Sequence, residues 1–269
     1  MNKQDFKDIS IIVPIRIDTK ERGENLNIIW NFYKENCENV DFIFVENDCK
    51  IKSNLYIPIN NIHYFIENTN VFNKCKTFNT GGKLSKRKYV CFLDVDIIIN
   101  PQQIINAKNK IIENKMDLMI PYNGIAFYLT KESKDKFMIY KNYDYLVSIF
   151  PEKFHTNYQN KNLLIANNQS VGGCIIMSND FFYKINGFNP NILIWGYDDN
   201  EIISRSQKLD YKVGRINGRH DVLWHLPHED KNSKPKEQHP FYEQNHQIVS
   251  MVESSTKEQL QEYIKTWEI

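Results

Sequence analysis

The sequence predicts an α/β fold built on a mainly parallel sheet with helices on both faces. Two short runs without charged residues, 9–15 and 89–93, are rich in β-branched and aromatic residues, which is typical of buried strands. Segments with helical periodicity separate the strand-like runs along the first half of the chain. This alternation favours parallel strands joined by right-handed crossovers.

The first half of the chain supplies most of the predicted sheet. Strands are expected at residues 9–15, 41–47, 62–66, 89–93 and 117–122. A helix is expected over 23–37, since its apolar residues fall at i, i+3, i+4 and i+7: Leu26, Ile29, Trp30 and Tyr33. Residues 73–85 are expected to begin as a helix and to be interrupted by Gly81-Gly82. Asn100 followed by Pro101 predicts the start of another helix.

The second half has a weaker pattern. Residues 131–168 predict a helix and then a long loop of the kind that often faces a substrate. Further strands are expected at 172–178, 212–216 and 222–226, and helices at 179–187 and 198–210. A polar stretch, 229–247, leads to a last helix near 255–266, whose apolar stripe we expect to pack on its own domain rather than on a partner: Leu260, Tyr263, Ile264 and Trp267. No linker or repeat divides the chain, so we expect one domain over 1–269.

Composition excludes several classes of protein. The 34 basic and 33 acidic residues are interleaved and give a net charge of +1, which argues against a nucleic-acid binder. A content of 41% hydrophobic and 13% aromatic residues argues against disorder. The sequence shows no apolar run long enough for a membrane span and no secretory signal. The five cysteines lack metal or disulfide spacing, and Cys91 and Cys174 are expected to be small buried hydrophobic residues in a reducing compartment.

Three motifs carry possible chemistry. Asp94-Val95-Asp96 follows an apolar strand, where paired carboxylates can hold a divalent cation whose other ligands are phosphate oxygens, although a DxD also occurs by chance in solvated turns. Residues 195–201 (WGYDDNE) place acidic residues after an aromatic turn; simple helix capping explains one carboxylate, and a general base for a sugar hydroxyl explains the pattern better. His225 and His228 lie three apart at a strand end, either as core residues or as metal ligands.

The order of these motifs resembles a known family. The residues that carry the resemblance are Phe72 to Gly81, Asp94-Val95-Asp96, Gly172-Gly173, Asn186-Gly187-Phe188, Trp195-Gly196-Tyr197-Asp198-Asp199 and His225. Over about residues 9–235 the chain resembles the β-1,4-galactosyltransferases and their bacterial relatives, including chondroitin-polymerase-like enzymes. The resemblance implies the GT-A fold, a Rossmann-like parallel sheet with a small antiparallel element near the DxD. It also implies a nucleotide-sugar half (1–125), an acceptor-binding and catalytic half (126–250) and a C-terminal helix (251–269).

The resemblance implies roles for individual residues. Pro14 and Arg16 would contact the nucleotide, and Phe72 would lie against uracil. Lys74, where the family prefers Arg, would lie near the diphosphate or ribose. The whole implied donor-binding set is Pro14, Arg16, Phe72, Lys74, Lys76, Asp94 and Gly173.

The same resemblance implies a metal and a catalytic set. Asp96 and His225 would hold Mn²⁺ or Mg²⁺, with Asp94 supporting the assembly. Val222 stands where the family has a methionine ligand, so water or His228 would have to complete the coordination. The implied catalytic residues are Asp199 as general base, Asp198 in place of the family's Glu, and Trp195 between donor and acceptor.

These roles predict an inverting transferase. It would move a hexose or N-acetylhexosamine from a UDP-sugar to a hydroxyl of a glycan or glycoconjugate. Ser170, where galactose-specific members carry a bulky Tyr, points to an N-acetylhexosamine donor. Asn200 replaces an acid and leaves Asp199 as the better base. We expect a cytoplasmic protein, including at the inner face of the cell membrane beside its acceptors; the sequence indicates no oligomeric state.

Other classes fit the residues less well. Retaining N-acetylgalactosaminyltransferase-like relatives with a similar turn usually carry Asn where Asp199 stands. A sugar nucleotidyltransferase needs a Gly-rich loop after the first strand, and residues 13–23 lack it. A metal-dependent hydrolase generally shows more His and Asp ligands, and a non-catalytic nucleotide-sugar-binding module has no need of Asp199.

Overall fold

A mixed sheet runs through the centre of the molecule, which we describe from a computed structural model over residues 3–58, 62–67, 71–140, 142–152, 159–160, 162–167, 169–194, 196–229 and 240–269. Within these residues the sheet has seven strands in the order β12-β8-β11-β6-β2-β4-β5. Their bounds are β2 Ile9–Ile15, β4 Asp41–Asp48, β5 Ile62–Glu67, β6 Tyr89–Leu93, β8 Leu118–Ile120, β11 Cys174–Ser178 and β12 Val213–Arg215. All neighbouring pairs are parallel except those of β11, which runs antiparallel to both β6 and β8. The mainly parallel sheet is therefore confirmed.

A second, smaller sheet lies next to the DxD. Its order in the described residues is β10-β9-β13-β7, with β7 Ile97–Ile98, β9 Ala126–Leu129, β10 Leu163–Asn167 and β13 Leu223–His225. Because β7 begins one residue after Asp96 and pairs antiparallel with β13, this sheet joins the DxD to the strand that ends at His225. The expected antiparallel element near the DxD is confirmed. A further short parallel pair joins β1 Gln4–Asp5 to β3 Cys37–Glu38.

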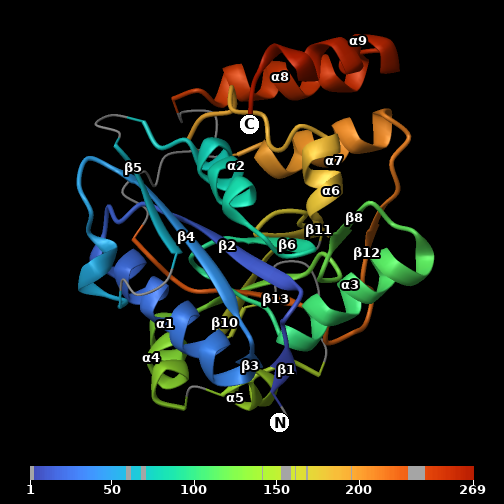
Figure 1. The fold of residues 1–269 in the computed structure, drawn as a ribbon. Coiled ribbons are helices and arrows are strands. Elements are labelled where there is room, and N and C mark those ends of the chain that lie inside the picture. The colour runs from blue at the N-terminus through green and yellow to red at the C-terminus, as the bar shows by residue number, and fades with distance from the viewer. Residues whose placement is uncertain are drawn as a thin grey trace.

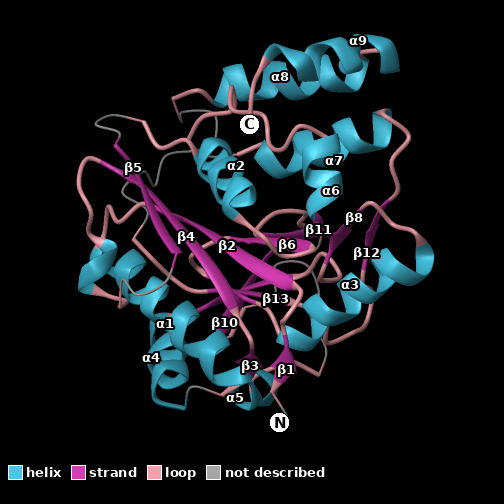
Figure 2. Ribbon diagram, in the orientation of Figure 1, coloured by secondary structure: helices cyan, strands magenta, loops and turns pink. Residues whose placement is uncertain are grey.

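Helices cover both faces of the main sheet, as Figures 1 and 2 show. One face carries α2 Lys74–Leu84, α6 Asn179–Lys184 and α7 Asp198–Lys208. The other carries α1 Lys20–Asn36 and α3 Pro101–Asn114; α4 Lys131–Tyr140 and α5 Tyr143–Ser148 lie beyond α1, next to the second sheet. The two C-terminal helices, α8 Tyr242–Ser254 and α9 Lys257–Tyr263, form an outer layer over α7. Short 3₁₀ turns occur at Ser53–Leu55 and Ile264–Thr266.

The N-terminal half follows its sequence pattern closely. The predicted face of α1 is buried, although the helix begins three residues earlier than expected because Thr19 caps it by accepting the N–H of Arg22. Asn100 caps α3 with Pro101 in its first turn, as predicted. Cys91 and Cys174 are buried free thiols whose sulfurs lie 3.6 Å apart.

The expected interruption of α2 at Gly81-Gly82 is wrong, because the helix continues to Leu84. A Cβ at position 81 would lie 2.3 Å from Cγ2 of Ile12, and one at position 82 would lie 2.4 Å from Cζ of Phe182. The glycines thus let α2 approach β2 and α6 closely, and this packing outweighs their low helix propensity.

The long loop expected within 131–168 is only partly correct. Two elements lie inside it, α5 and β10, and β9 precedes it without having been predicted. β10 pairs with β9 over a long sequence separation, which local periodicity does not report. Similarly, α8 begins inside the stretch 229–247, which was expected to be a polar connection. The hydropathy pattern did not reveal this helix, because its buried side includes an asparagine, Asn245.

The last helix packs on its own domain, as predicted. Leu260 is buried, and the indole of Trp267 lies over the guanidinium of Arg205, 5.4 Å from ring centroid to Cζ. Arg205 and Glu201 form a fully buried ion pair, with Nε 2.8 Å from Oε1. Arg205 also donates to the carbonyl oxygens of Ile185 and Gly187, so this pair joins α7 to the end of α6 and to the C-terminal segment. No helix in the described ranges is both long and apolar enough to cross a membrane.

We expect Gly81→Ala to destabilise the protein by roughly 1–3 kcal/mol, because its methyl group would overlap Ile12 in a packed interior. The sign of this change in the free energy of unfolding distinguishes the two cases, since alanine stabilises an unhindered helix by about 1 kcal/mol relative to glycine. Urea denaturation measures the difference. Adding Ile12→Ala, which removes the clashing Cγ2, should make the cost of Gly81→Ala smaller; a stabilising Gly81→Ala would contradict this account of α2.

Candidate functional site

The DxD lies at the carboxyl end of β6, between β2 and β11 in the sheet. Its backbone is tied to two distant segments: the N–H of Asp94 donates to the carbonyl of Gly173, 3.0 Å, and the N–H of Leu226 donates to the carbonyl of Asp96, 2.7 Å. The first bond joins the DxD to the start of β11, and the second joins it to the end of β13. Candidate residues from three parts of the sequence therefore meet at one edge of the sheet.

Lys74, in the first turn of α2, connects Asp94 to the start of α7. Its Nζ lies 2.9 Å from Oδ2 of Asp94, 2.8 Å from Oδ2 of Asp198 and 3.8 Å from Oδ2 of Asp199. The Lys74 side chain is only 14% exposed. Burial alone would lower the pKa of Lys74, but the carboxylates of Asp198, Asp199 and Asp94 outweigh it and raise that pKa well above its usual value. Lys74 is therefore a buried ammonium ion at the centre of an acidic cluster.

Asp199 lies against the Gly172-Gly173 backbone. The N–H of Gly173 donates to its carboxylate, and a Cβ at position 172 would lie 2.4 Å from its Oδ2. Burial, followed by the neighbouring charges of Asp198 and Asp94, raises the pKa of Asp199 well above its usual range despite Lys74. A carboxylate with a raised pKa in a confined position is suited to accept a proton.

A second cluster forms on the other side of the DxD. Nε2 of His228 lies 3.1 Å from Oδ2 of Asp96, and Nε2 of His225 lies 3.9 Å from Oδ1 of Asp96. One ligand atom from each of the three residues lies within 4.8 Å of the others, a grouping that can hold a metal ion. The ring of Tyr128 stacks on that of His225 with centroids 4.3 Å apart, which fixes the orientation of the imidazole. Arg22 also reaches Asp96, with Nη1 3.4 Å from Oδ2.

The electrostatics of this cluster favour an ionised Asp96 and a neutral His225, whereas His228 would have to lose a proton before it could bind a metal. Burial lowers the pKa of His225, which favours the neutral imidazole, the form that binds metals. Burial also opposes charge on His228, but its hydrogen bond to Asp96 prevails and raises the pKa of His228. Burial would raise the pKa of Asp96, yet His225, His228 and Arg22 hold it well below its usual value, so Asp96 is ionised. Two imidazoles and a carboxylate suit Mn²⁺ as donors, and Mg²⁺ less well because it prefers oxygen ligands.

Some donor-binding candidates approach these clusters and others do not. Pro14 is buried within β2, and Arg16 follows that strand with its Nη1 buried and without a hydrogen-bond partner in the described residues. Phe72 is half-buried, and its carbonyl accepts the N–H of Ile194, 3.0 Å. Lys76 is exposed and lies two residues from Lys74, so the helix turns it away from the acidic cluster. Trp195 lies outside the described residues.

Several residues at this edge escaped the sequence analysis. Asn47 and Asp48 end β4 next to β2, and Asn47 accepts the backbone N–H of Asn73, 3.0 Å, at the start of α2. Their position at the carboxyl end of a predicted parallel strand was a usable signal. The hydroxyl of Tyr122 donates to the carbonyl of Gly172, 2.6 Å, and lies 3.0 Å from Oγ of Ser170, and so fixes the backbone beside Asp199. No local pattern pointed to Tyr122.

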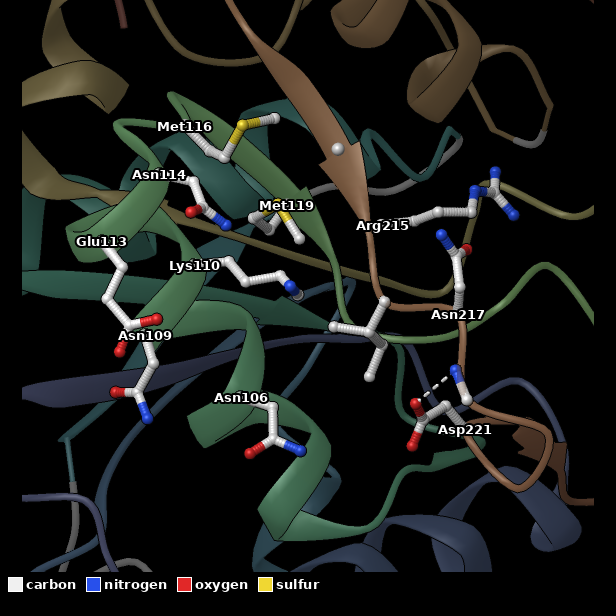
Figure 3. Close-up of a pocket in the computed structure, with 13 residues that line it drawn as sticks. Asn106, Asn109, Lys110, Glu113, Asn114, Met116, Met119, Arg215, Asn217 and Asp221 are labelled. Carbon is white, nitrogen blue, oxygen red and sulfur yellow. Dashed lines mark hydrogen bonds between the residues drawn. The ribbon is translucent and has the colours of Figure 1, made fainter.

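An open pocket of about 680 Å³ lies elsewhere, between α3 and β12 (Figure 3). Asn106 and Lys110 of α3 line one side, and Arg215 and Asn217 line the other. None of the carboxylates or histidines of the two clusters lines it. The chemistry-bearing residues are therefore at the sheet edge and not in this pocket.

Comparisons with known proteins agree with this architecture. A family model described as the N-terminal domain of galactosyltransferase matches residues 152–229, under a third of the chain. A Drosophila β-1,4-galactosyltransferase 7 mutant in complex with manganese, UDP-Gal and xylobiose is 15% identical, with a TM-score of 0.51 over 91% of this chain and 79% of that one. The catalytic domain of the Drosophila enzyme with xylobiose is 16% identical, with a TM-score of 0.49 over 94% and 82% of the two chains.

A mannosyltransferase from Pyrobaculum calidifontis in complex with GDP-Man and Mn²⁺ is 14% identical, with a TM-score of 0.50 over 84% of this chain and 58% of that one. No curated protein sequence matches the chain. At these identities the likeness shows the fold alone, and that fold is GT-A, as the sequence resemblance implied.

We expect Lys74→Met to destabilise the protein by about 3–5 kcal/mol at pH 7, because it leaves three buried carboxylates without their cation. The pKa values of Asp94 and Asp199 are already raised, and removing Lys74 raises them further. A raised folded-state pKa destabilises the fold above the unfolded pKa of about 4, and this penalty disappears as the pH falls toward that value.

The destabilisation by Lys74→Met should therefore shrink between pH 7 and pH 4.5 in chemical denaturation. Lys76→Met, exposed on the same helix, is the matched control and should change little at either pH. An equal loss of stability at both pH values would contradict the electrostatic role of Lys74.

Proposed function

We propose that this protein is a metal-dependent, inverting glycosyltransferase that moves a hexose or N-acetylhexosamine from a UDP-sugar to a hydroxyl of a glycan or glycoconjugate. One observation carries the proposal: the DxD joins an Asp–His–His cluster on one side to a Lys–carboxylate cluster containing Asp199 on the other. A diphosphate donor needs a cation on its leaving group and a base near its sugar. In open α/β sheets ligands bind beyond the carboxyl ends of the strands, which is where both clusters lie. We take residues 1–269 as one catalytic domain.

Asp96, His225 and His228 are the residues that would hold Mn²⁺ or Mg²⁺. His228 would then take the place left by Val222, which is fully buried. Oδ1 of Asp94 is buried and has no hydrogen-bond partner among the described residues, which suits a supporting role beside the cation. When bound, the ion would neutralise charge on the departing diphosphate. Both solved complexes named with a nucleotide sugar also contain manganese, which supports this assignment.

Asp199 would act as the general base. It would accept the proton of the acceptor hydroxyl as that oxygen attacks the anomeric carbon, while Asp198 and Lys74 hold the adjoining charges. A positioned base contributes about 10²–10⁴-fold to such a reaction. The attack would come from the face opposite the diphosphate, so the anomeric configuration would invert. Trp195 would bridge donor and acceptor.

The nucleotide would lie along the ends of β2 and β4. Arg16, whose buried Nη1 lacks a partner in the described residues, would donate to the diphosphate. Phe72 and Pro14 would contact the uridine. Ser170 is small and hydrogen-bonded to Tyr122, which favours room for an N-acetyl group on the donor sugar.

We expect Asp199→Asn to lower transfer by about 10²–10⁴-fold, because the amide cannot accept the proton. The assay follows UDP release from UDP-Gal, UDP-Glc, UDP-GalNAc and UDP-GlcNAc with Mn²⁺, with and without xylobiose or monosaccharide acceptors. UDP affinity, measured by calorimetry, should be unchanged. Near wild-type transfer in Asp199→Asn would show that the base is another residue.

Asp96→Ala should abolish Mn²⁺-dependent binding of UDP in the same titration, since it removes the one carboxylate of the Asp–His–His cluster. His228→Ala should weaken Mn²⁺ binding about 10–100-fold, in the range found for the loss of supporting ligands. His246→Ala, an exposed histidine outside the cluster, is the control and should titrate as the wild type does. An unaltered titration for Asp96→Ala would remove the metal site from the proposal.

A further inference from the structure

We propose that Asn245 of α8 is a positioning residue for the reaction, because it holds the backbone of residues 193–194 and 196–197, here called the turn, which leads into Asp198 and Asp199. The inference rests on the proposed function of Asp199. It gives a reaction role to a helix that lies in the outer layer, over α7 (Figure 1).

Three residues of this turn have backbone conformations that are unfavourable for most side chains. Ile194, Gly196 and Tyr197 have φ angles of 61°, 86° and 72°, all in the left-handed region. That region disfavours side chains in general and β-branched ones such as isoleucine most strongly. Tyr197 is also the N-cap of α7, and its side chain makes no capping hydrogen bond. A strained segment of this kind persists only where surrounding groups hold it.

Asn245 supplies that support from the first turns of α8. It is fully buried, and its amide brackets the turn: Oδ1 accepts the N–H of Leu193, 3.2 Å, and Nδ2 donates to the carbonyls of Leu193, 2.9 Å, and Gly196, 3.4 Å. A side chain of this size that accepts one hydrogen bond and donates two has to be an amide. A carboxylate would lose both donated bonds, and an alkyl group would lose all three.

Two further contacts complete the support. The hydroxyl of Tyr242, at the start of α8, lies 2.8 Å from the hydroxyl of Tyr197. From the opposite direction, the carbonyl of Phe72 accepts the N–H of Ile194. The turn is thus held between α8 and the segment that leads into α2, the helix that carries Lys74.

The turn in turn sets the position of the carboxylates. Asp198 and Asp199 are the first two residues of α7, and the N–H of Glu201 donates to the carbonyl of Tyr197, 2.8 Å. A shift of the turn therefore shifts the start of the helix and moves Asp199 relative to Gly172 and Gly173. A displacement of about 1 Å at reacting groups is enough to lower a rate by about 10²-fold.

The experiment has to distinguish this positioning role of Asn245 from a role in fold stability alone. α8 also packs through Val252, which is fully buried and has no part in holding the turn. Val252→Ala is therefore the matched control: it should lower the melting temperature without lowering kcat at a temperature where the protein is folded.

The test compares Asn245→Ala, Asn245→Asp and Val252→Ala. It measures UDP release at saturating UDP-sugar with Mn²⁺, the affinity for UDP with Mn²⁺ by calorimetry, and thermal unfolding. We expect kcat to fall by about 10²-fold in Asn245→Ala, with unchanged affinity for UDP and Mn²⁺, and no rescue by Asn245→Asp. If Asn245→Ala does not fold, Tyr242→Phe deletes only one hydroxyl and should still lower kcat several-fold.

Two outcomes would overturn the inference. One is an unchanged kcat in folded Asn245→Ala or in Tyr242→Phe, and the other is an equal loss of kcat in Val252→Ala. Failure of the proposed function is distinguishable, because the wild type would then release no UDP from any UDP-sugar, and a wrong assignment of the base would leave Asp199→Asn with wild-type release whatever the Asn245 variants do. Loss of release in Asp199→Asn together with an unchanged Asn245→Ala would overturn only the role of α8.

Discussion

The ammonium group of Lys74 is the interaction on which the arrangement at the sheet edge depends. Asp94, Asp198 and Asp199 would repel one another in a buried space, and burial already raises the pKa values of Asp94 and Asp199 even with a cation nearby. Lys74 reaches all three because α2 lies close to β2, and α2 lies close because Gly81 has no side chain. Packing at one end of a short helix thus determines the charge balance at its other end, and with it the geometry available for chemistry.

The sequence was most informative where one local pattern decides a structure. The apolar runs at β2 and β6 and the cap of α3 formed as predicted, since each depends on neighbouring residues. It was misleading where a distant partner decides. The glycines of α2 pack against Ile12 and Phe182, β10 needs β9 as its partner, and α8 buries an asparagine that a hydropathy pattern counts as polar.

The residues of the candidate site also fall into those that a local pattern identifies and those that depend on distant partners. Asp96 was identifiable because parallel strands present their carboxyl ends at one edge, and His225 was identifiable from its spacing to His228 and from the resemblance. The resemblance suggested His228 as a stand-in ligand, and the structure brings it to 3.1 Å from Asp96. Supporting residues such as Tyr122 and Asn245 were not identifiable, since their only signature is a hydrogen bond to the backbone of a distant loop. Periodicity and motif spacing carry no record of such bonds.

The buried pair of Glu201 and Arg205 constrains how this chain can change over generations. A buried ion pair adds little net stability compared with a well-packed apolar pair, so nothing in its energy alone requires it. Replacing either partner first, however, strands the other charge in the interior at a cost of about 3–5 kcal/mol, a large part of the stability of a typical domain. Descendants of this sequence would therefore keep both residues or exchange them together. Each single substitution would therefore pass through a poorly folded intermediate, even though apolar alternatives exist two substitutions away.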